Sequence, residues 1–218
     1  MAKPLATLRR QFARQGWHLL FSFDTSIEPG SIIERKRARD VNQLGSITAY
    51  AKLGDLELAG PADIGLLDFV RTHELSVAAT AELLETNRMA AAADRAKTVR
   101  LSLDRPVKWY VADKIRLFSM LAADRDWPAC PQARRLALKR HFLVTDVVRT
   151  RLRFTFEGSR GVSLDAETTG LKNLRGAELS GGFRWENRYE LATKTEWTIA
   201  YEAVRWRRKP GLFETLRA

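Results

Sequence analysis

The feature that most constrains the fold is a long run of period-two alternation between His141 and Trp206. In its first part, apolar residues alternate with arginines: Val148, Leu152, Phe154 and Phe156 with Arg149, Arg151 and Arg153. Successive side chains of a β-strand point to opposite faces of the sheet. The pattern therefore predicts a strand with one apolar face and one basic face.

Turn residues divide the rest of this run into further strands. Gly158 and Gly161 bracket one turn before a strand over residues 161–165, and Gly181-Gly182 closes a later one. In the last strand, four residues are expected on one face and three on the other: Trp197, Ile199, Tyr201 and Ala203, against Glu196, Thr198 and Glu202. Aromatic and β-branched residues at period two are typical of strands, so we expect an antiparallel sheet.

The N-terminal half predicts a mixture of helices and strands. Residues 5–15 have the apolar spacing of a short amphipathic helix that Gly16 ends. It either packs on the sheet or lies on a membrane surface. Residues 17–23 and 44–53 are expected to be strands, and the charged run 34–40 is expected to be a solvated loop, with a phosphate or lipid contact as the alternative.

The middle of the chain predicts further helices around one strand. Pro61-Ala-Asp63 is expected to open a helix, and the Ala-rich residues 79–97 to form another. Residues 99–111 predict a strand that continues past Pro106. Asp113 is expected near the start of a helix with Ile115, Phe118 and Leu121 on one face, followed by a basic helix over residues 132–140. Together with the strands, this predicts an α+β fold: a central, twisted, mainly antiparallel sheet surrounded by helices.

Charge and cysteine content narrow the class of partner and the compartment. The net charge is +11, which favours an anionic partner, either nucleic acid or acidic lipid. The less specific interpretation is a soluble basic protein whose charge only prevents its aggregation. The single cysteine, Cys130, excludes an internal disulfide framework and fits a reducing cytoplasm. We expect neither a signal peptide nor an apolar run of transmembrane length.

The sequence lacks the recognisable motifs of enzymes and of metal or cofactor sites. His18, His73 and His141 stand in no ligand spacing, and Cys130 has no CxxC partner. There is no nucleophile elbow, phosphate-binding loop or dinucleotide fingerprint. Cys130 with His141 is the one obvious candidate dyad, and a structural cysteine is the simpler interpretation. We therefore predict that the protein is not an enzyme and uses no cofactor.

Several segments, read together, resemble the bacterial gasdermins, which are pore-forming relatives of animal pyroptosis proteins. They are the strand at 17–23 after a short helix, Glu28-Pro-Gly-Ser-Ile-Ile33, Asn42-Gln-Leu-Gly45, Val99-Arg-Leu-Ser-Leu103 with residues 112–118, and the segments 142–148, 161–165 and 197–206. The likeness runs through most of the chain. It implies the fold of a gasdermin N-terminal domain, with a pore-forming domain at residues 1–206.

The resemblance also implies a function and a set of partners. A gasdermin rests in the cytoplasm and, when released, forms a homo-oligomer on the inner (cell) membrane, where refolded hairpins build a large β-barrel pore. The outcome is cell death, which in bacteria serves anti-phage defence. The strand residues 148–156 are the candidate membrane strand. Basic residues are the candidates for contact with anionic lipids: Arg9, Arg10, Arg14, Arg35, Lys36 and Arg37.

Two departures from the family concern the ends of the chain. Residues 2–6 lack the acylated cysteine common in bacterial gasdermins, and the segment after Trp206 is shorter than the usual inhibitory segment. We expect residues 207–218 to be a basic linker with a short tail. Arg207, Arg208 and Lys209 are a candidate cleavage site for an activating protease, and Leu212, Phe213 and Leu216 are candidates for an inhibitory plug. Control by dissociation of an inhibitory partner protein, or by a ligand, is the alternative.

A nucleic-acid-binding module is the rival function. Arg149, Arg151 and Arg153 on one sheet face, with aromatic residues nearby, can contact a phosphate backbone and stack bases. Such binding depends strongly on salt and causes no membrane leakage. Against it, the sequence carries none of the recognisable RNA-binding signatures. A plain structural protein predicts neither behaviour.

Overall fold

A computed structural model gives the fold. The residues that it describes are 9–10, 12–24, 26–37, 40–51, 57–63, 98–157, 179–185, 188–206 and 213–215. The strands are β1 (His18–Asp24), β2 (Ser31–Arg37), β3 (Asp40–Ser46), β4 (Leu58–Asp63), β5 (Thr98–Val111), β6 (His141–Glu157), β7 (Leu179–Trp185), β8 (Arg188–Thr193), β9 (Trp197–Trp206) and β10 (Phe213–Thr215). The helices are η1 (Ile47–Ala49), α5 (Lys114–Ala123), η4 (Trp127–Ala129) and α6 (Pro131–Leu136), and residues 9–10 and 12–14 are also helical.

The described strands form one sheet, and all of their pairings are antiparallel. The path through its body is β1–β9–β6–β2–β3, while β4 extends β5, and β7 extends β8. This confirms the expected α+β class with a central antiparallel sheet. The predicted strand at residues 161–165 and the helix at 79–97 lie outside the described residues.

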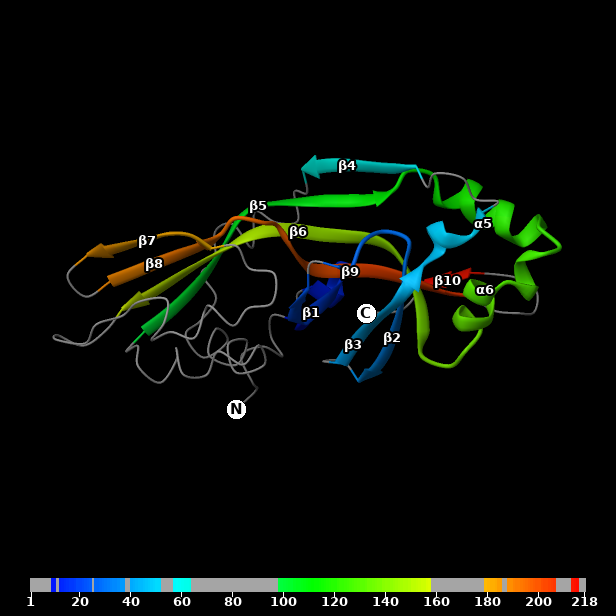
Figure 1. The fold of residues 1–218 in the computed structure, drawn as a ribbon, viewed down its shortest axis with the longest axis horizontal. Coiled ribbons are helices and arrows are strands. Elements are labelled where there is room, and N and C mark those ends of the chain that lie inside the picture. The colour runs from blue at the N-terminus through cyan, green and yellow to red at the C-terminus, as the bar shows by residue number, and fades with distance from the viewer. Residues whose placement is uncertain are drawn as a thin grey trace.

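Strand β6 is the central strand of the sheet, because it pairs with four other strands. One of its edges pairs first with β2 and then with β5, and the other pairs first with β9 and then with β8. The far ends of β5 and β6 leave the rest of the sheet together with β7 and β8 (Figure 1). We call this four-stranded extension the arm: residues 98–104, 151–157, 179–185 and 188–193. We call the remainder the body.

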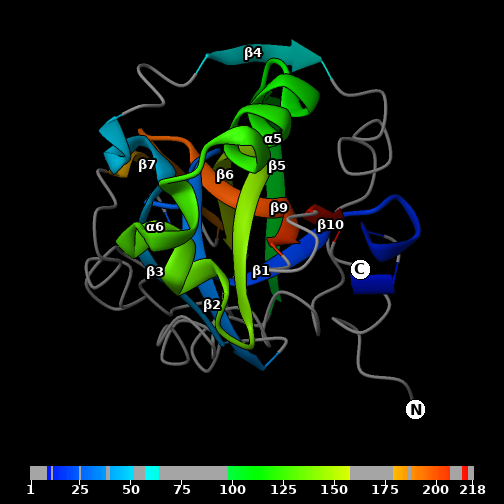
Figure 2. The same ribbon diagram turned by 90° about the vertical axis from the view of Figure 1, so that its right-hand side faces the viewer.

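Side chains pack on both faces of the body. On one face, Ile32, Leu143 and Val204 pack with α5, η4 and α6 through Leu117, Trp127 and Leu136, among other buried residues. Figure 2 shows these helices gathered at the end of the sheet that faces away from the arm. On the other face, Ile33, Val144, Val147 and Tyr201 form a second cluster. A sheet covered on both faces needs apolar residues at consecutive positions, which the run of Ile32-Ile33 and Phe142-Leu143-Val144 supplies.

This two-sided packing also extends to the last strand. Trp197, Ile199, Tyr201 and Ala203 are buried as expected. Thr198, expected on the opposite, polar face, is also fully buried, and its Oγ1 donates a 2.8 Å hydrogen bond to the carbonyl of Ile27. The polar alternation of a strand therefore marks its second face without showing whether that face is solvated.

The predicted loop over residues 34–40 is wrong, because these residues belong mainly to a hairpin. Residues 34–37 are in β2, and Asp40 begins β3, with Arg37 opposite Asp40. The predicted strand at 44–53 ends at Ser46, whose side chain caps the 3-10 helix η1 by accepting from the backbone N–H of Thr48. Charged side chains on strands near an open sheet edge remain compatible with pairing.

Two helix predictions also need comparison with the structure. Pro61-Ala-Asp63 lies in strand β4, which pairs with β5, and the helix predicted to follow it lies outside the described residues. Helix α5 does start after Asp113, whose Oδ1 accepts a 2.7 Å hydrogen bond from the backbone N–H of Arg116. Its buried face, however, is carried by Leu117 and Leu121, four residues apart, while Ile115 is 80% exposed. The basic helix expected at 132–140 is α6, and it ends at Leu136.

Candidate functional site

The arginine row of β6 has the two-faced character that the sequence predicts. Val148, Leu152 and Phe154 are completely buried, whereas Arg151 and Arg153 are exposed and Arg149 is half-buried. Thr150 occupies an apolar-face position and is buried, with its Oγ1 donating a 3.0 Å hydrogen bond to the carbonyl of Asp104 in β5. The side chain of Phe156 lies outside the described residues.

Two of the three arginines are paired with carboxylates from other parts of the chain. The Nη2 atom of Arg149 lies 3.0 Å from Oε1 of Glu28, which belongs to the β1–β2 connection. The Nη2 atom of Arg153 lies 3.9 Å from Oδ2 of Asp104 on β5. Both contacts involve exposed carboxylates and are individually weak. They nevertheless neutralise part of the basic face in this conformation.

A buried ionic cluster lies within the body of the sheet. Its centre is Asp146 of β6, whose side chain is completely buried. The Nζ atom of Lys108 on β5 lies 2.8 Å from Oδ1 of Asp146, and Nζ of Lys114 at the start of α5 contacts the other carboxylate oxygen. Lys114 also lies 3.5 Å from Oε2 of Glu202 on β9. The cluster thus joins three neighbouring strands and one helix through two positive and two negative groups.

The two carboxylates of this cluster have opposite pKa shifts. Burial by itself raises the pKa of Asp146, but hydrogen bonds from Lys108 and Lys114 outweigh it and hold that pKa below its ordinary value of 3.8. Burial and then the negative charge of Asp146 raise the pKa of Glu202 above 4.5, against the attraction of Lys114. Asp146 is therefore the carboxylate that the surroundings favour as an anion.

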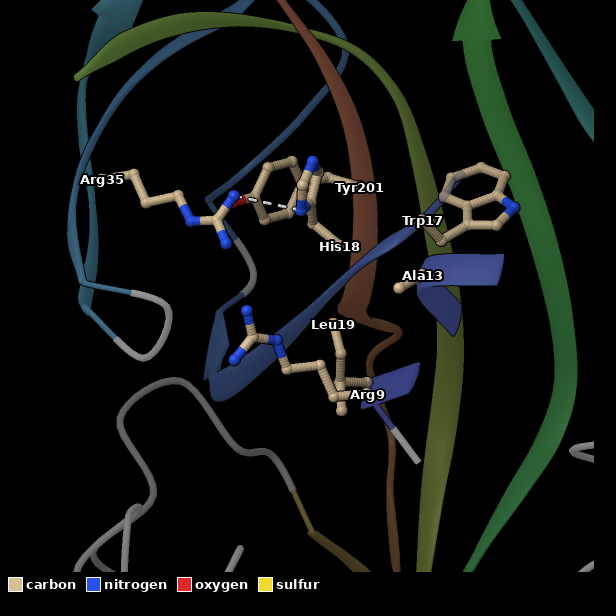
Figure 3. Close-up of a pocket in the computed structure, with 7 residues that line it drawn as sticks. All are labelled: Arg9, Ala13, Trp17, His18, Leu19, Arg35 and Tyr201. Atoms are coloured by element: carbon tan, nitrogen blue, oxygen red, sulfur yellow. Dashed lines mark hydrogen bonds between the residues drawn. The ribbon is translucent and has the colours of Figure 1, made fainter. Parts of the chain in front are cut away.

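A second charged site, the basic pocket, lies beside the N-terminal helix. It is lined by Arg9, Ala13, Trp17, His18, Leu19, Arg35 and Tyr201 (Figure 3). His18 and Tyr201 stack with ring centroids 5.2 Å apart and are partners in the β1–β9 register. The guanidinium of Arg35 donates to Nδ1 of His18 over 3.1 Å, which requires a neutral imidazole with an unprotonated Nδ1.

Tyr201 is held in its neutral form by this environment. Burial raises its pKa to about 12, and the positive charge of Arg35 acts in the opposite direction. The hydroxyl group of Tyr201 therefore stays protonated at physiological pH. Two guanidinium groups, an imidazole and a phenol consequently surround one small opening.

The predicted lipid-contact residues separate into two groups. Arg9 and Arg35, 26 positions apart in the sequence, line the same pocket. Arg10 and Arg14 are exposed on the N-terminal helix, which buries Phe12 and ends at Gly16 with φ +86°. Lys36 is exposed with its Nζ 3.6 Å from Glu34, and the side chain of Arg37 lies outside the described residues.

The tail contributes one strand to the body. Residues 213–215 form β10, which pairs with the end of β9 so that Phe213 is opposite Trp206 and Thr215 is opposite Val204. Strand β1 pairs with an earlier part of β9, at residues 198–201. The candidate cleavage residues Arg207, Arg208 and Lys209, and the plug residues Leu212 and Leu216, lie outside the described residues.

Sequence reasoning missed the ionic cluster and half of the basic pocket. Lys108, Lys114, Asp146 and Glu202 come from four separate elements, and His18 and Tyr201 were assigned only to strands. One signal was available: Asp146 is the single acidic residue in the apolar run from Phe142 to Val148. A carboxylate in a strand buried on both faces requires a buried cation.

The structure assigns structural contacts to the candidate dyad. The Sγ atom of Cys130 accepts a 3.3 Å hydrogen bond from the backbone N–H of Ala133 at the start of α6. Nδ1 of His141 lies 3.2 Å from the carbonyl of Lys139. Across the described parts of the chain, no group of three or more metal-ligating side chains occurs. None of the helices described there has the length and apolar character needed to cross a membrane.

Comparison with known proteins supports the fold and goes no further. No protein-family model matches the sequence, and no curated protein matches it. Among solved structures, the chain is similar to a bacterial gasdermin from Bradyrhizobium tropiciagri, with a TM-score of 0.55 and 14% sequence identity. The match covers 99% of this chain and 91% of that one. The chain therefore has a gasdermin-like fold along almost its whole length.

Proposed function

We propose that the chain is a pore-forming protein that oligomerises on a membrane into a large β-barrel and causes cell death, in a bacterial anti-phage defence. The observation that carries the proposal is the gasdermin-like fold over 99% of the chain. The alternation of apolar and basic residues in the arm is consistent with it.

The arm has the side-chain pattern that a barrel wall needs. A strand in a transmembrane barrel places apolar residues toward lipid and polar residues toward the water-filled interior. In β6, Leu152 and Phe154 can take the first role, and Arg151 and Arg153 the second. Closure of the barrel satisfies the backbone hydrogen bonds, which an open sheet edge in lipid cannot.

The surface charge of the chain supports recruitment to anionic membranes. Each lysine or arginine near such a surface contributes about 1 kcal/mol of attraction. Arg10 and Arg14 are exposed on one helix, and Lys36 is exposed on β2. Together with Arg9, Arg35 and Arg37, these residues give enough attraction to concentrate the protein on the cytoplasmic face of the inner membrane.

We propose that the tail acts as a lock, meaning the segment that keeps the chain inactive. Strand β10 occupies the stretch of the β9 edge that β1 leaves unpaired, at residues 204–206. An unpaired strand edge is a template for pairing with another chain. We infer that β10 keeps this edge from a second copy, and that cleavage at Arg207, Arg208 or Lys209 frees it.

A disulfide across β9 and β10 tests the lock without removing any residue. Arg205 and Glu214 are antiparallel partners, and such partners lie at Cα separations of roughly 4.5–5.5 Å, within the range that a disulfide spans. We would make Arg205→Cys with Glu214→Cys in a Cys130→Ser background and cleave the chain in its 207–209 linker. Dye leakage from anionic liposomes is expected only after reduction.

The controls decide between the functions. The Cys130→Ser chain with its linker cleaved, but without the disulfide, is expected to leak dye in either redox state. Leakage from the uncleaved chain would keep the pore and discard the tail as its lock. If no form leaks from anionic or neutral liposomes and the chain instead binds nucleic acid with steep salt dependence, the nucleic-acid-binding alternative replaces the pore.

A further inference from the structure

The first part of β6, residues 142–148, carries apolar side chains on both faces of the sheet. Leu143 packs with the helices on one face, whereas Val144 and Val147 belong to the cluster on the other. A slip of a strand by one residue exchanges its two faces. Because both faces are apolar here, such a slip would still bury apolar side chains. The apolar pattern therefore specifies the register of this part of β6 only weakly.

The register between β5 and β6 shifts by one residue between the arm and the body. Asp104 is opposite Arg151 and Val107 is opposite Arg149, so β5 advances three residues where β6 advances two. Pro106 lies within this shift, and a residue without a backbone N–H is tolerated in strands at such bulges. The extra residue reverses which face the side chains of β5 occupy from that point onward.

This reversal serves both parts of the sheet at once. In the arm, Leu103 is opposite Leu152, so that the two side chains share one apolar face. In the body, Lys108 reaches the buried carboxylate of Asp146 over 2.8 Å. Without the extra residue only one of these two matches is possible. Either Leu103 moves to the polar face of the arm, or Lys108 moves to the face that Asp146 does not occupy.

The register between β6 and β9 shifts on both sides of the ionic cluster. Between Val144 and Asp146, β6 has one residue more than β9, and between Val148 and Arg149, β9 has one residue more than β6. The paired positions between these two shifts include Asp146 with Glu202. The cluster therefore lies on a short paired segment whose register is not continuous with that of the strands on either side.

We propose that the ionic cluster determines the register of β5, β6 and β9, with Asp146 as its positioning residue. Asp146 is the single acidic residue in the run from Phe142 to Val148. A slip of β6 by one residue would carry this carboxylate to the opposite, apolar face, away from Lys108 and Lys114, where its charge would be buried without a partner. Fixing register is the best-attested use of buried polar and charged groups. The proposal rests on the pore-forming function only for its consequence, which is the alignment of the apolar faces of β5 and β6 that a barrel wall needs.

An apolar replacement of the cluster separates its effect on register from its effect on stability. We would combine Lys108→Met, Lys114→Met and Asp146→Leu in a Cys130→Ser background. Replacing buried ion pairs by apolar residues of similar volume is often neutral or stabilising, so this triple variant is expected to fold. Circular dichroism and urea unfolding check this. Glu202, whose side chain is 26% exposed, is left unchanged.

Pairs of cysteines report the register directly. Ser102→Cys with Arg153→Cys are opposite each other in the observed register, whereas Leu103→Cys with Arg153→Cys are opposite only after a slip of one residue. Val107→Cys with Arg149→Cys report the observed register on the body side of the shift. Antiparallel partners lie at Cα separations of roughly 4.5–5.5 Å, which a disulfide spans. Each pair would be oxidised in the full-length chain, with and without the three cluster substitutions.

With the cluster intact, we expect both observed-register pairs to form and the slipped pair to remain reduced. In the triple variant, the ratio of observed-register to slipped product is expected to fall by about tenfold or more, as the loss of a buried charge pairing implies. The fall would be seen as trapping of the slipped pair in the arm or as loss of the 107–149 pair in the body. Glu28→Gln removes another ion pair of β6 and is the control, expected to leave all three yields unchanged.

Two results would overturn the inference. One is unchanged formation of both observed-register pairs in the folded triple variant, and the other is an equal loss of register in Glu28→Gln. Should the triple variant not fold, Lys108→Met alone leaves Asp146 paired with Lys114. An unchanged ratio in that variant would overturn the inference equally.

Dye leakage is measured separately and without the cysteine pairs. If the Cys130→Ser chain with its linker cleaved does not leak dye, the pore proposal fails, while the cross-linking ratio still tests the role of the cluster. If that chain leaks and the cross-linking ratio is unchanged, the register proposal is wrong and the pore proposal stands.

Discussion

The ionic cluster and the basic pocket lie on opposite faces of strand β9, and they differ in charge balance. Glu202 belongs to the cluster, and its neighbour Tyr201 lines the pocket; adjacent side chains of a strand point to opposite faces. The cluster sets Lys108 and Lys114 against Asp146 and Glu202. The pocket has two arginines and no acid.

This difference distinguishes a site whose charges are balanced by nearby opposite charges from one whose lining has positive charge alone. Buried charges are tolerated when opposite charges and hydrogen bonds surround them, and the cluster meets that condition within the chain. The pocket includes the exposed Arg9, and none of its lining residues is acidic. Trp17 connects the two sites, because it lines the pocket while Nζ of Lys108 lies 5.3 Å from the centroid of its ring.

The largest expected effect comes from unbalancing the cluster with Asp146→Asn. The change leaves Lys108 and Lys114 beside a neutral group at a buried position, and breaking a buried ion pair on one side typically lowers the free energy of unfolding by about 3–5 kcal/mol. Urea unfolding measures this loss. Asp104→Asn, which removes the exposed partner of Arg153, is the control and is expected to cost less than about 1 kcal/mol.

The difference in stability between the wild-type chain and Asp146→Asn has a defined pH dependence. Because the pKa of folded Asp146 is lowered, its stabilising contribution is present above 3.8 and is lost as the pH falls through the folded value below that. The wild-type advantage over Asp146→Asn should therefore be complete near neutral pH and disappear in strong acid. An advantage that is small at neutral pH, or independent of pH, would contradict the assignment of Asp146 as the centre of the cluster.

A smaller effect, of opposite sign, is expected for Glu202→Gln. The pKa of Glu202 is raised, so any stability linked to its protonation is present below 4.5 and is lost as the pH rises through the folded value. At neutral pH a neutral side chain of the same shape should stabilise the fold by up to about 1 kcal/mol, since it removes the repulsion from Asp146. Urea unfolding would detect this. A loss similar to that of Asp146→Asn would show that the two carboxylates contribute equally.

The smallest expected effect concerns Tyr201 in the basic pocket. The chain has four tyrosines, and an ultraviolet absorbance titration should show one of them ionising at about 12, a step that Tyr201→Phe removes. Because this pKa is raised, the contribution of Tyr201 to stability is present below 10.0 and is lost as the pH rises toward about 12. Arg35→Gln should raise the pKa of Tyr201 further. Ionisation of all four tyrosines together near 10.0 would argue against the burial of the Tyr201 hydroxyl group.

The sequence by itself determined the elements whose signals are local. The alternation of Leu152 and Phe154 with Arg151 and Arg153 sets the two faces of β6, because adjacent side chains of a strand point to opposite faces. Asp113 marks the start of α5 for the same reason, since a capping side chain bonds to a backbone group three residues away. The antiparallel sheet with its α+β class followed from several such segments.

The tertiary structure decided which segments become neighbours. Residues 34–37 pair in a hairpin and Pro61 enters β4, because pairing with another strand outweighs the local preference of a charged or proline-containing segment. Asp146 meets Lys108 through the β5–β6 pairing and Glu202 through the β6–β9 pairing. Arg9 meets Arg35 only once β1 and β2 have packed into the body. Both charged sites depend on the strand register between distant segments, which is fixed by packing over the whole sheet. Apart from the acidic Asp146 within an apolar run, no local pattern in the sequence marks them.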